Sequence, residues 1–206
     1  MWPRTRSGYD LPTAPRAMEK DVSRVLLTEE EIRAGLRRVA GEITEEYRGG
    51  DLAVVAVLHG SCVFVADLIR LLPIPLTLEF VACASYGDGT LSSGEVRLTF
   101  IPGAEDFAGR RVLLVDDILD TGRTLARVRE ALRERGAADV RTCVFLDKPA
   151  RRLVRIRPDF RGFEVEDVFV VGYGLDFAGR YRNLPFLAAL KPEVYAARHA
   201  SPEPRG

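Results

Sequence analysis

Residues 111–124 read RVLLVDDILDTGRT, and this stretch decides the fold. Residues 112–115 form a continuous apolar run, which is typical of a central parallel strand buried on both faces. Asp116 and Asp117 end that run, an Asp-Thr-Gly turn follows at 120–122, and a helical pattern of apolar residues comes next. The stretch therefore predicts a strand, a turn rich in carboxylates, and a helix, as in an α/β protein.

This strand-to-helix junction also predicts a ligand site, because open α/β sheets bind ligands at the carboxyl ends of their strands. Backbone N–H groups at the helix start, with the hydroxyls of Thr121 and Thr124, suit a phosphate. Asp116 and Asp117 would repel a phosphate. A ligand with a phosphate at one end and hydroxyls in its middle satisfies both groups, so the pattern predicts a ribose 5-phosphate site.

The order strand, two acidic residues, two apolar residues, Asp-Thr-Gly, Thr resembles the phosphoribosyl-diphosphate loop of type I phosphoribosyltransferases. Four more motifs resemble the hypoxanthine-guanine branch: VLHGS at 57–61, SYGDGTLSSG at 85–94, LDKP at 146–149 and FVVGYGLDFAGRYRNLPF at 169–186. The resemblance implies the type I phosphoribosyltransferase fold, a central, mostly parallel sheet flanked by helices. It also implies a small hood from the terminal segments and a flexible lid loop.

The same resemblance implies an activity in purine salvage. The expected reaction is the Mg²⁺-dependent transfer of a 5-phosphoribosyl group from phosphoribosyl diphosphate to N9 of hypoxanthine or guanine. By resemblance, Asp116 and Asp117 hold the ribose hydroxyls and Asp120 is the catalytic acceptor of the N7 proton. The residues expected to bind phosphoribosyl diphosphate are Asp116, Asp117, Asp120, Thr121, Gly122, Arg123, Thr124, His59, Gly60 and Arg182.

This chain departs from the family pattern at two of these positions. His59 stands where relatives usually carry a lysine, which leaves the backbone contacts of the 59–61 turn possible without that side chain. Asp116 stands where the family usually has glutamate, so the shorter side chain needs a water to reach the hydroxyl.

Lys148 is the expected selector of the purine. Only three of the 30 Lys and Arg residues are lysine, so a lysine placed after a predicted strand is informative. An ammonium group donates to a 6-oxo group and cannot accept from a 6-amino group. By resemblance, the other purine-binding residues are Phe169 (stacking), Val170 (backbone), Leu175 (carbonyl) and Asp176.

The resemblance also implies a metal and a lid. Asp176 and Asp117 are the expected Mg²⁺ residues, with Asp176 acting through water, since Mg²⁺ prefers oxygen ligands and retained waters. Ser85 and Tyr86 are expected at the hinge and tip of the lid, which would close over the reaction centre and exclude water.

Periodicity predicts the remaining elements. Thr28 and Glu31 form a capping box that starts a helix ending before Gly49-Gly50. The other predicted elements are strands at 52–58, 76–82, 139–146 and 168–171, a second arm after the lid at 95–101, a helix at 63–72 and a docked tail at 191–195. The last section of the chain is expected to start at 160–165, with no element assigned there.

Composition sets the broad class. The chain has 206 residues with a formal net charge of zero, which argues against bulk nucleic-acid binding. It has no run of about 18 apolar residues that could span a membrane. Its three cysteines are expected to be buried, reduced thiols of a cytoplasmic protein. We expect one domain at 21–197, an extension at 1–20, a frayed tail at 198–206, and a homodimer or homotetramer.

Three alternatives stay open from the sequence. A relative could prefer xanthine, could regulate by binding nucleotides or RNA, or could bind nucleotides without chemistry. Lys148 and the FVVGYGLD run favour a purine enzyme, and the absence of a basic face disfavours RNA binding. The intact Asp-Thr-Gly turn at 120–122 disfavours binding without chemistry.

Overall fold

The computed structural model describes residues 18, 20–85, 96–100 and 107–199. Within these residues, the main sheet has the strand order β4-β3-β2-β5-β6-β7. Neighbouring strands are parallel except for the antiparallel pair β3 and β4, which confirms the predicted, mostly parallel sheet. Its strands are β2 (Leu52–Leu58), β3 (Leu76–Ser85), β4 (Val96–Phe100), β5 (Arg111–Leu119), β6 (Asp139–Asp147) and β7 (Phe160–Glu164).

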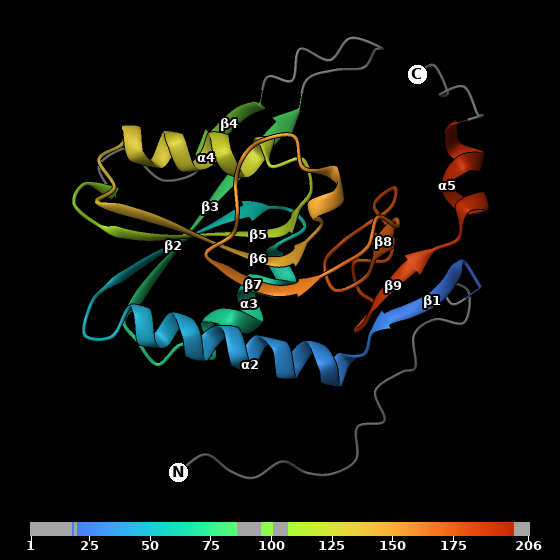
Figure 1. Cartoon of the computed structure of the whole chain (residues 1–206), viewed down its shortest axis with the longest axis horizontal. Coiled ribbons are helices and arrows are strands. Elements are labelled where there is room, and N and C mark those ends of the chain that lie inside the picture. The colour runs from blue at the N-terminus through green and yellow to red at the C-terminus, as the bar shows by residue number, and fades with distance from the viewer. Residues whose placement is uncertain (1–17, 19, 86–95, 101–106, 200–206) are drawn as a thin grey trace.

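Helices cover both faces of this sheet (Figure 1). Helices α2 (Glu29–Glu46) and α3 (Cys62–Ile69) pack on the face of β2 that carries Val54, and α4 (Arg123–Glu134) packs on the opposite face with Val55. The capping box of Thr28 with Glu31 is present at the start of α2, as predicted. Period-two alternation along β2 explains this division, because successive side chains point to opposite faces of a strand.

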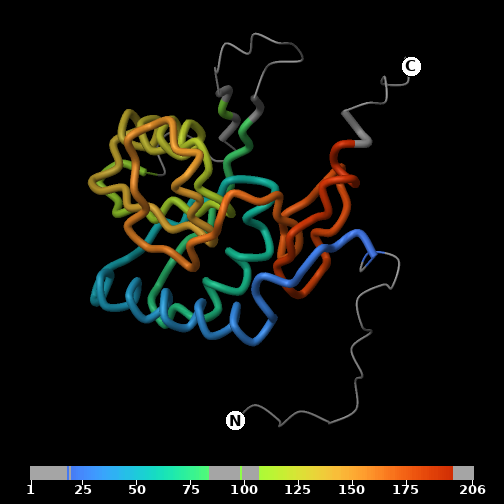
Figure 2. Tube along the Cα trace, turned by 45° about the vertical axis from the view of Figure 1, so that its right-hand side comes forward, coloured from blue at the N-terminus to red at the C-terminus, as the bar shows by residue number. Residues whose placement is uncertain are grey.

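A second, three-stranded sheet lies beside the carboxyl edge of the main one (Figures 1 and 2). Strand β1 (Val22–Leu27) pairs antiparallel with β9 (Leu187–Leu190), which also pairs with β8 (Val170–Val171). A strand from the early part of the chain therefore pairs with strands from its late part in one small unit, which confirms the predicted hood. Its last element is the helix α5 (Pro192–His199), where a short docked tail was predicted.

Strand β5 is longer than the sequence pattern predicts. The apolar run ends at Val115, but Asp116, Ile118 and Leu119 continue the parallel pairing with β6. Backbone hydrogen bonds with a neighbouring strand do not depend on side-chain polarity, so the carboxylates extend the strand instead of ending it. The acidic pair is therefore carried by a sheet strand and not by a loop.

The prediction that all three cysteines are buried is wrong for Cys62, which is exposed as the first residue of α3. Cys83 is half-buried and Cys143 is buried in the sheet. Burial raises the pKa of the Cys83 thiol to about 11 and also raises the pKa of Cys143.

The predicted lid lies outside the described residues except for Ser85, the last residue of β3; Tyr86 is among those outside. Strands β3 and β4 flank it as an antiparallel pair, as expected for its two arms. In the part of the chain that the structure describes, none of the helices combines the length and apolar character needed to cross a membrane.

Candidate active site

The acidic pair at the end of β5 is held in an electrostatically costly position. Asp116 is 6% exposed, and its Oδ1 accepts a hydrogen bond of 2.9 Å from the Asp117 N–H. Burial raises the pKa of both carboxyls, and the neighbouring Asp117 raises that of Asp116 further. Arg182 partly opposes the rise in the pKa of Asp117. A ligand that donates hydroxyl hydrogens to this pair would relieve the cost of its charge.

The turn after β5 is fixed by a loop behind it. Gly122 has a φ of +86° and directly precedes α4. The carbonyl of Thr121 accepts hydrogen bonds of 3.0 Å from the N–H groups of Leu153 and Val154. A Cβ added to Gly122 would lie 2.7 Å from Ile156 Cγ2, so a larger residue would push the turn off its support. The turn thus keeps its outer face free for a ligand.

A hollow of about 360 Å³ lies between these groups. We call it the phosphate-side hollow. Its lining brings together nine of the ten residues predicted to bind phosphoribosyl diphosphate, while Arg123 lies outside it, exposed at the start of α4. Those nine residues are His59, Gly60, Asp116, Asp117, Asp120, Thr121, Gly122, Thr124 and Arg182, and the hollow is also lined by Asp176 and Cys83.

Two glycines allow separate segments to converge on this hollow. A Cβ on Gly60 would lie 1.5 Å from Asp117 Oδ2, and one on Gly174 would lie 2.3 Å from the Gly60 carbonyl oxygen. Arg182 donates to the Gly174 carbonyl at 2.7 Å and pairs with Asp176 at 2.7 Å. The 59–61 turn therefore packs closely against the acidic end of β5. It also packs closely against residues 172–186, the segment between β8 and β9 that we call the hood segment.

Asp120 presents an unsatisfied acceptor. Among the described residues, its buried Oδ1 has no hydrogen-bond partner, and the Arg151 Nε lies 3.7 Å away. Leaving a buried carboxylate oxygen without a donor is costly, and a catalytic role or a bound water or ion is among the explanations for such atoms in native structures. The geometry suits a group that accepts a proton from a bound molecule.

Lys148 and Phe169 line a second hollow of about 330 Å³, together with Arg151 and Asp167. We call it the purine-side hollow. Lys148 is 4% exposed, and its ammonium donates to the Val168 carbonyl at 2.7 Å. Arg151 lies between the two hollows, because its Nε is 3.7 Å from Asp120 and 3.9 Å from Asp167.

Three of the other residues predicted to bind the purine, Val170, Leu175 and Asp176, do not line the purine-side hollow. The side chains of Val170 and Leu175 are buried, so only their backbone groups are available for a ligand. The Leu175 carbonyl already accepts a bond of 3.0 Å from the Gly172 N–H. One ring face of Phe169 stacks on Tyr195 of α5, with centroids 5.2 Å apart. Asp176 lines the phosphate-side hollow and not the purine-side one.

Sequence reasoning missed Arg151, Arg152 and the wall residue Cys83. Arginine is so frequent in this chain that nothing in the sequence separates these two from the solvated ones. The half-buried position of Cys83 depends on where β3 lies beside β2, which no local pattern encodes.

Residues 25–178 match the model of the phosphoribosyl transferase domain. The chain belongs to the phosphoribosyl transferase family. It is 44% identical over 179 residues to a hypoxanthine-guanine phosphoribosyltransferase of Bacillus subtilis, covering 86% of this chain and 98% of that protein.

Two further proteins similar to this chain carry hypoxanthine phosphoribosyltransferase or HprT in their names. A hypoxanthine phosphoribosyltransferase structure from Staphylococcus aureus superposes with a TM-score of 0.81 at 39% identity, covering 87% of this chain and 97% of that one. The chain is also 44% identical over 180 residues to a bifunctional protein TilS/HprT of Listeria innocua. That match covers 87% of this chain but 28% of the longer protein.

Proposed function

We propose that this chain transfers the 5-phosphoribosyl group of phosphoribosyl diphosphate to N9 of hypoxanthine or guanine, giving IMP or GMP and diphosphate. One observation carries the proposal: a buried acidic pair, a turn at a helix N-terminus and an arginine line one hollow of about 360 Å³. The names of its phosphoribosyltransferase relatives support the purine as acceptor.

Each part of the phosphoribosyl donor has a matching protein group. Asp116 and Asp117 accept from the ribose 2′ and 3′ hydroxyls, which positions the reacting carbon. The Asp120–Thr124 turn binds the 5-phosphate through backbone N–H groups and hydroxyls. The diphosphate lies against the 59–61 turn and Arg182, which neutralise charge as it departs. The purine nitrogen attacks the anomeric carbon from the opposite side.

We propose Asp120 as the acceptor of the proton that leaves N7 of the purine. This role is supported by its buried Oδ1, which lacks a hydrogen-bond donor among the described residues. Lys148 donates a hydrogen bond to the 6-oxo group of the purine and so selects it. Its ammonium carries three N–H donors. One donates to the Val168 carbonyl and the group also pairs with Asp167 at 3.5 Å, which leaves at least one donor for a purine.

The residues present fit Mg²⁺. In the described part of the chain, no group of three or more His, Cys, Asp or Glu residues could hold a metal ion. Mg²⁺ needs only one or two carboxylates, because it keeps several waters and shares substrate phosphates. Asp117 and Asp176, both facing the phosphate-side hollow, are the proposed residues. When bound, Mg²⁺ would stabilise negative charge on the departing diphosphate.

We further propose that residues 21–197 act as one domain in a homodimer or homotetramer. Support comes from Leu71, which is 40% exposed and lines a hollow beside α3 together with Val63 and Pro185. Charged side chains, among them Arg33, Arg37 and Asp67, line the same hollow. Light scattering of the purified chain tests this assembly, and a monomer at micromolar concentration would contradict it.

The proposed activity is tested by a spectrophotometric assay with phosphoribosyl diphosphate and Mg²⁺. Hypoxanthine, guanine, xanthine and adenine are offered separately, to the wild type and to Lys148→Gln. We expect turnover of hypoxanthine and guanine and none of adenine. The variant should lose at least about tenfold in kcat/KM for both 6-oxo purines, since one charge-assisted hydrogen bond is worth about 1.5–3 kcal/mol. No turnover of any purine, with IMP binding intact, would instead indicate a regulatory protein.

A further inference from the structure

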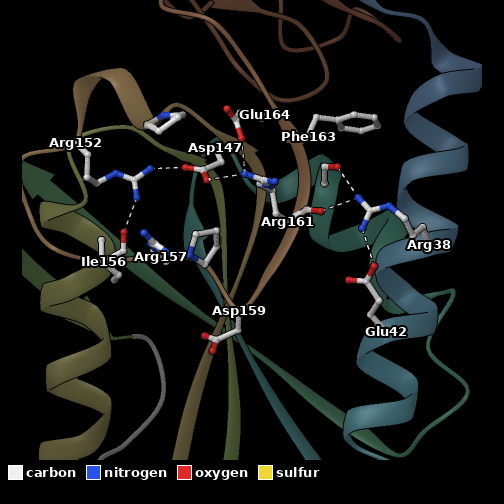
Figure 3. Close-up of a pocket in the computed structure, with 13 residues that line it drawn as sticks. Arg38, Glu42, Asp147, Arg152, Ile156, Arg157, Asp159, Arg161, Phe163 and Glu164 are labelled. Carbon is white, nitrogen blue, oxygen red and sulfur yellow. Dashed lines mark hydrogen bonds and ion pairs between the residues drawn. The ribbon is translucent and has the colours of Figure 1, made fainter.

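Arg152 makes four hydrogen-bonding contacts in the loop behind the proposed active site. Its guanidinium donates to the carbonyls of Asp120 at 2.9 Å, Leu119 at 3.0 Å and Ile156 at 2.7 Å. It also forms an ion pair with the Asp147 carboxylate. Figure 3 shows Arg152 reaching from the side of α4 toward Asp147 and Ile156. Only 16% of its side chain is exposed, so these contacts are largely shielded from water.

These contacts join the two halves of the proposed site. Leu119 is the last residue of β5, and Asp120, the proposed proton acceptor, directly follows it. Asp147 ends β6 and directly precedes Lys148, the proposed purine reader. A further bond of 3.0 Å runs from the Lys148 N–H to the Leu119 carbonyl. The Arg152 guanidinium therefore lies where the backbone at Asp120 meets the backbone at Lys148.

Asp147 is held from its other side as well. Its carboxylate, 8% exposed, also pairs with Arg161 of β7 at 3.3 Å. In Figure 3 the Asp147 carboxylate lies between Arg152 and Arg161. A buried carboxylate with two guanidinium partners is strongly restrained, whereas an exposed single pair would contribute little.

We propose that Arg152 is a positioning residue for the reaction, acting with Asp147 as a clamp. The clamp fixes the backbone at Asp120 relative to Lys148, so that the proton acceptor meets the N7 of a purine held at its 6-oxo group. This inference rests on the proposed roles of Asp120 and Lys148.

The planar fork of arginine explains why a lysine cannot replace it here. Three guanidinium nitrogens of Arg152 address three carbonyls in fixed directions, and one of them also reaches Asp147. A lysine ammonium is a single point donor on a flexible stem. It would keep the charge near Asp147 and release at least one of the carbonyls, which loosens the backbone at Asp120.

The test compares Arg152→Lys, Arg152→Gln and Asp147→Asn in steady-state assays. Arg155→Gln is the matched control, because Arg155 lies exposed in the same loop and contacts no other described residue through a hydrogen bond or ion pair. Since a misplacement of about 1 Å can cost about 100-fold, we expect Arg152→Lys to lower kcat about 10- to 100-fold. The KM for phosphoribosyl diphosphate should change much less, and Arg155→Gln should match the wild type.

A double-mutant cycle separates positioning from general destabilisation. If Arg152 acts through Asp120, Arg152→Lys should cause no further loss of kcat in the Asp120→Asn background. An equal loss in both backgrounds, wild-type kcat in Arg152→Lys, or unfolding of all three variants by circular dichroism would overturn the clamp. If Asp120→Asn itself keeps full turnover, the proposed proton acceptor fails first, and this result is distinguishable from the others.

Discussion

At the scale of single residues, three aspartates of one short stretch lie in different environments, and these environments suit them to different roles. Asp116 and Asp117 lie at the end of β5, where burial raises the pKa of each carboxyl. Asp120 lies three residues further on, with one oxygen unpartnered among the described residues. The first two suit hydroxyl binding and the third suits proton transfer, although the side chains are chemically the same.

Replacing Asp120, the proposed proton acceptor, should affect turnover more than binding. Asp120→Asn keeps the size of the side chain but cannot take a proton. We expect kcat to fall about 100-fold or more, in the range of general-base catalysis, with little change in the Kd for phosphoribosyl diphosphate. Steady-state kinetics and calorimetric titration measure the two quantities. Equal losses in both would contradict the assignment.

Replacing Asp116 should stabilise the fold while damaging the site. A carboxyl whose pKa is raised in the folded state lowers stability as the pH rises through the interval between its unfolded and folded values. Asp116→Asn should therefore resemble the wild type below about pH 4, near the ordinary aspartate value. At neutral pH it should be more stable, by about 1.4 kcal/mol for each pH unit that separates the folded and unfolded pKa values of Asp116.

Urea unfolding across this pH range measures the gain of Asp116→Asn. A gain that is constant with pH would show that charge burial is not its cause. The kcat/KM of the variant should fall despite the added stability, because a ribose hydroxyl loses its carboxylate.

At the scale of elements, the site depends on glycines that let backbone segments touch. A Cβ on Gly60 would meet Asp117 Oδ2 at 1.5 Å, so either the Asp117 carboxylate or the 59–61 turn would have to move. We expect Gly60→Ala to fold and to lose about 100-fold in kcat/KM, since both segments are proposed to contact the donor.

Gly41→Ala is the control for this change. Gly41 lies in α2, where an added Cβ meets nothing within 4 Å. It should keep full activity and gain about 0.5–1 kcal/mol in unfolding free energy, the usual helix preference for alanine. Full activity in Gly60→Ala would contradict the close packing of the turn on Asp117.

At the scale of the whole molecule, polar contacts help to join the hood to the main sheet and its helices. Tyr173 of the hood segment donates to Asp67 of α3 at 2.7 Å, whereas Tyr181 donates to Asp21 within the hood at 2.8 Å. Arg182 and Asp176 reach the phosphate-side hollow from the same hood segment. We therefore expect Tyr173 to help orient this hood segment at the site.

Tyr173→Phe and Tyr181→Phe should separate these two effects. Each removes one hydrogen bond, so each should cost about 1 kcal/mol in stability. Only Tyr173→Phe should also raise the KM for phosphoribosyl diphosphate. It removes the hydrogen bond to α3 that helps to hold the segment carrying Arg182 and Asp176 in place. Thermal melts and initial rates measure both quantities. The same KM in the two variants would mean that the tyrosine does not orient the hood.

The sequence by itself determined the local elements and the family. The apolar run of 112–115, the capping box at Thr28 and the Asp-Thr-Gly turn are patterns of a few adjacent residues, and backbone preferences act at that range. Motifs in the same order as in the family then predicted the sheet, the hood and most of the phosphate-side hollow.

Only the tertiary structure decided the contacts between distant segments. Pairing with β6 extended β5 through Asp116 to Leu119, and the exposed place of Cys62 follows from how α3 packs. Arg152 meets the Leu119 and Asp120 carbonyls across more than 30 residues of chain. Nothing in the composition marks that arginine, because its role comes from burial and from the directions of three carbonyls that exist only after the strands have paired.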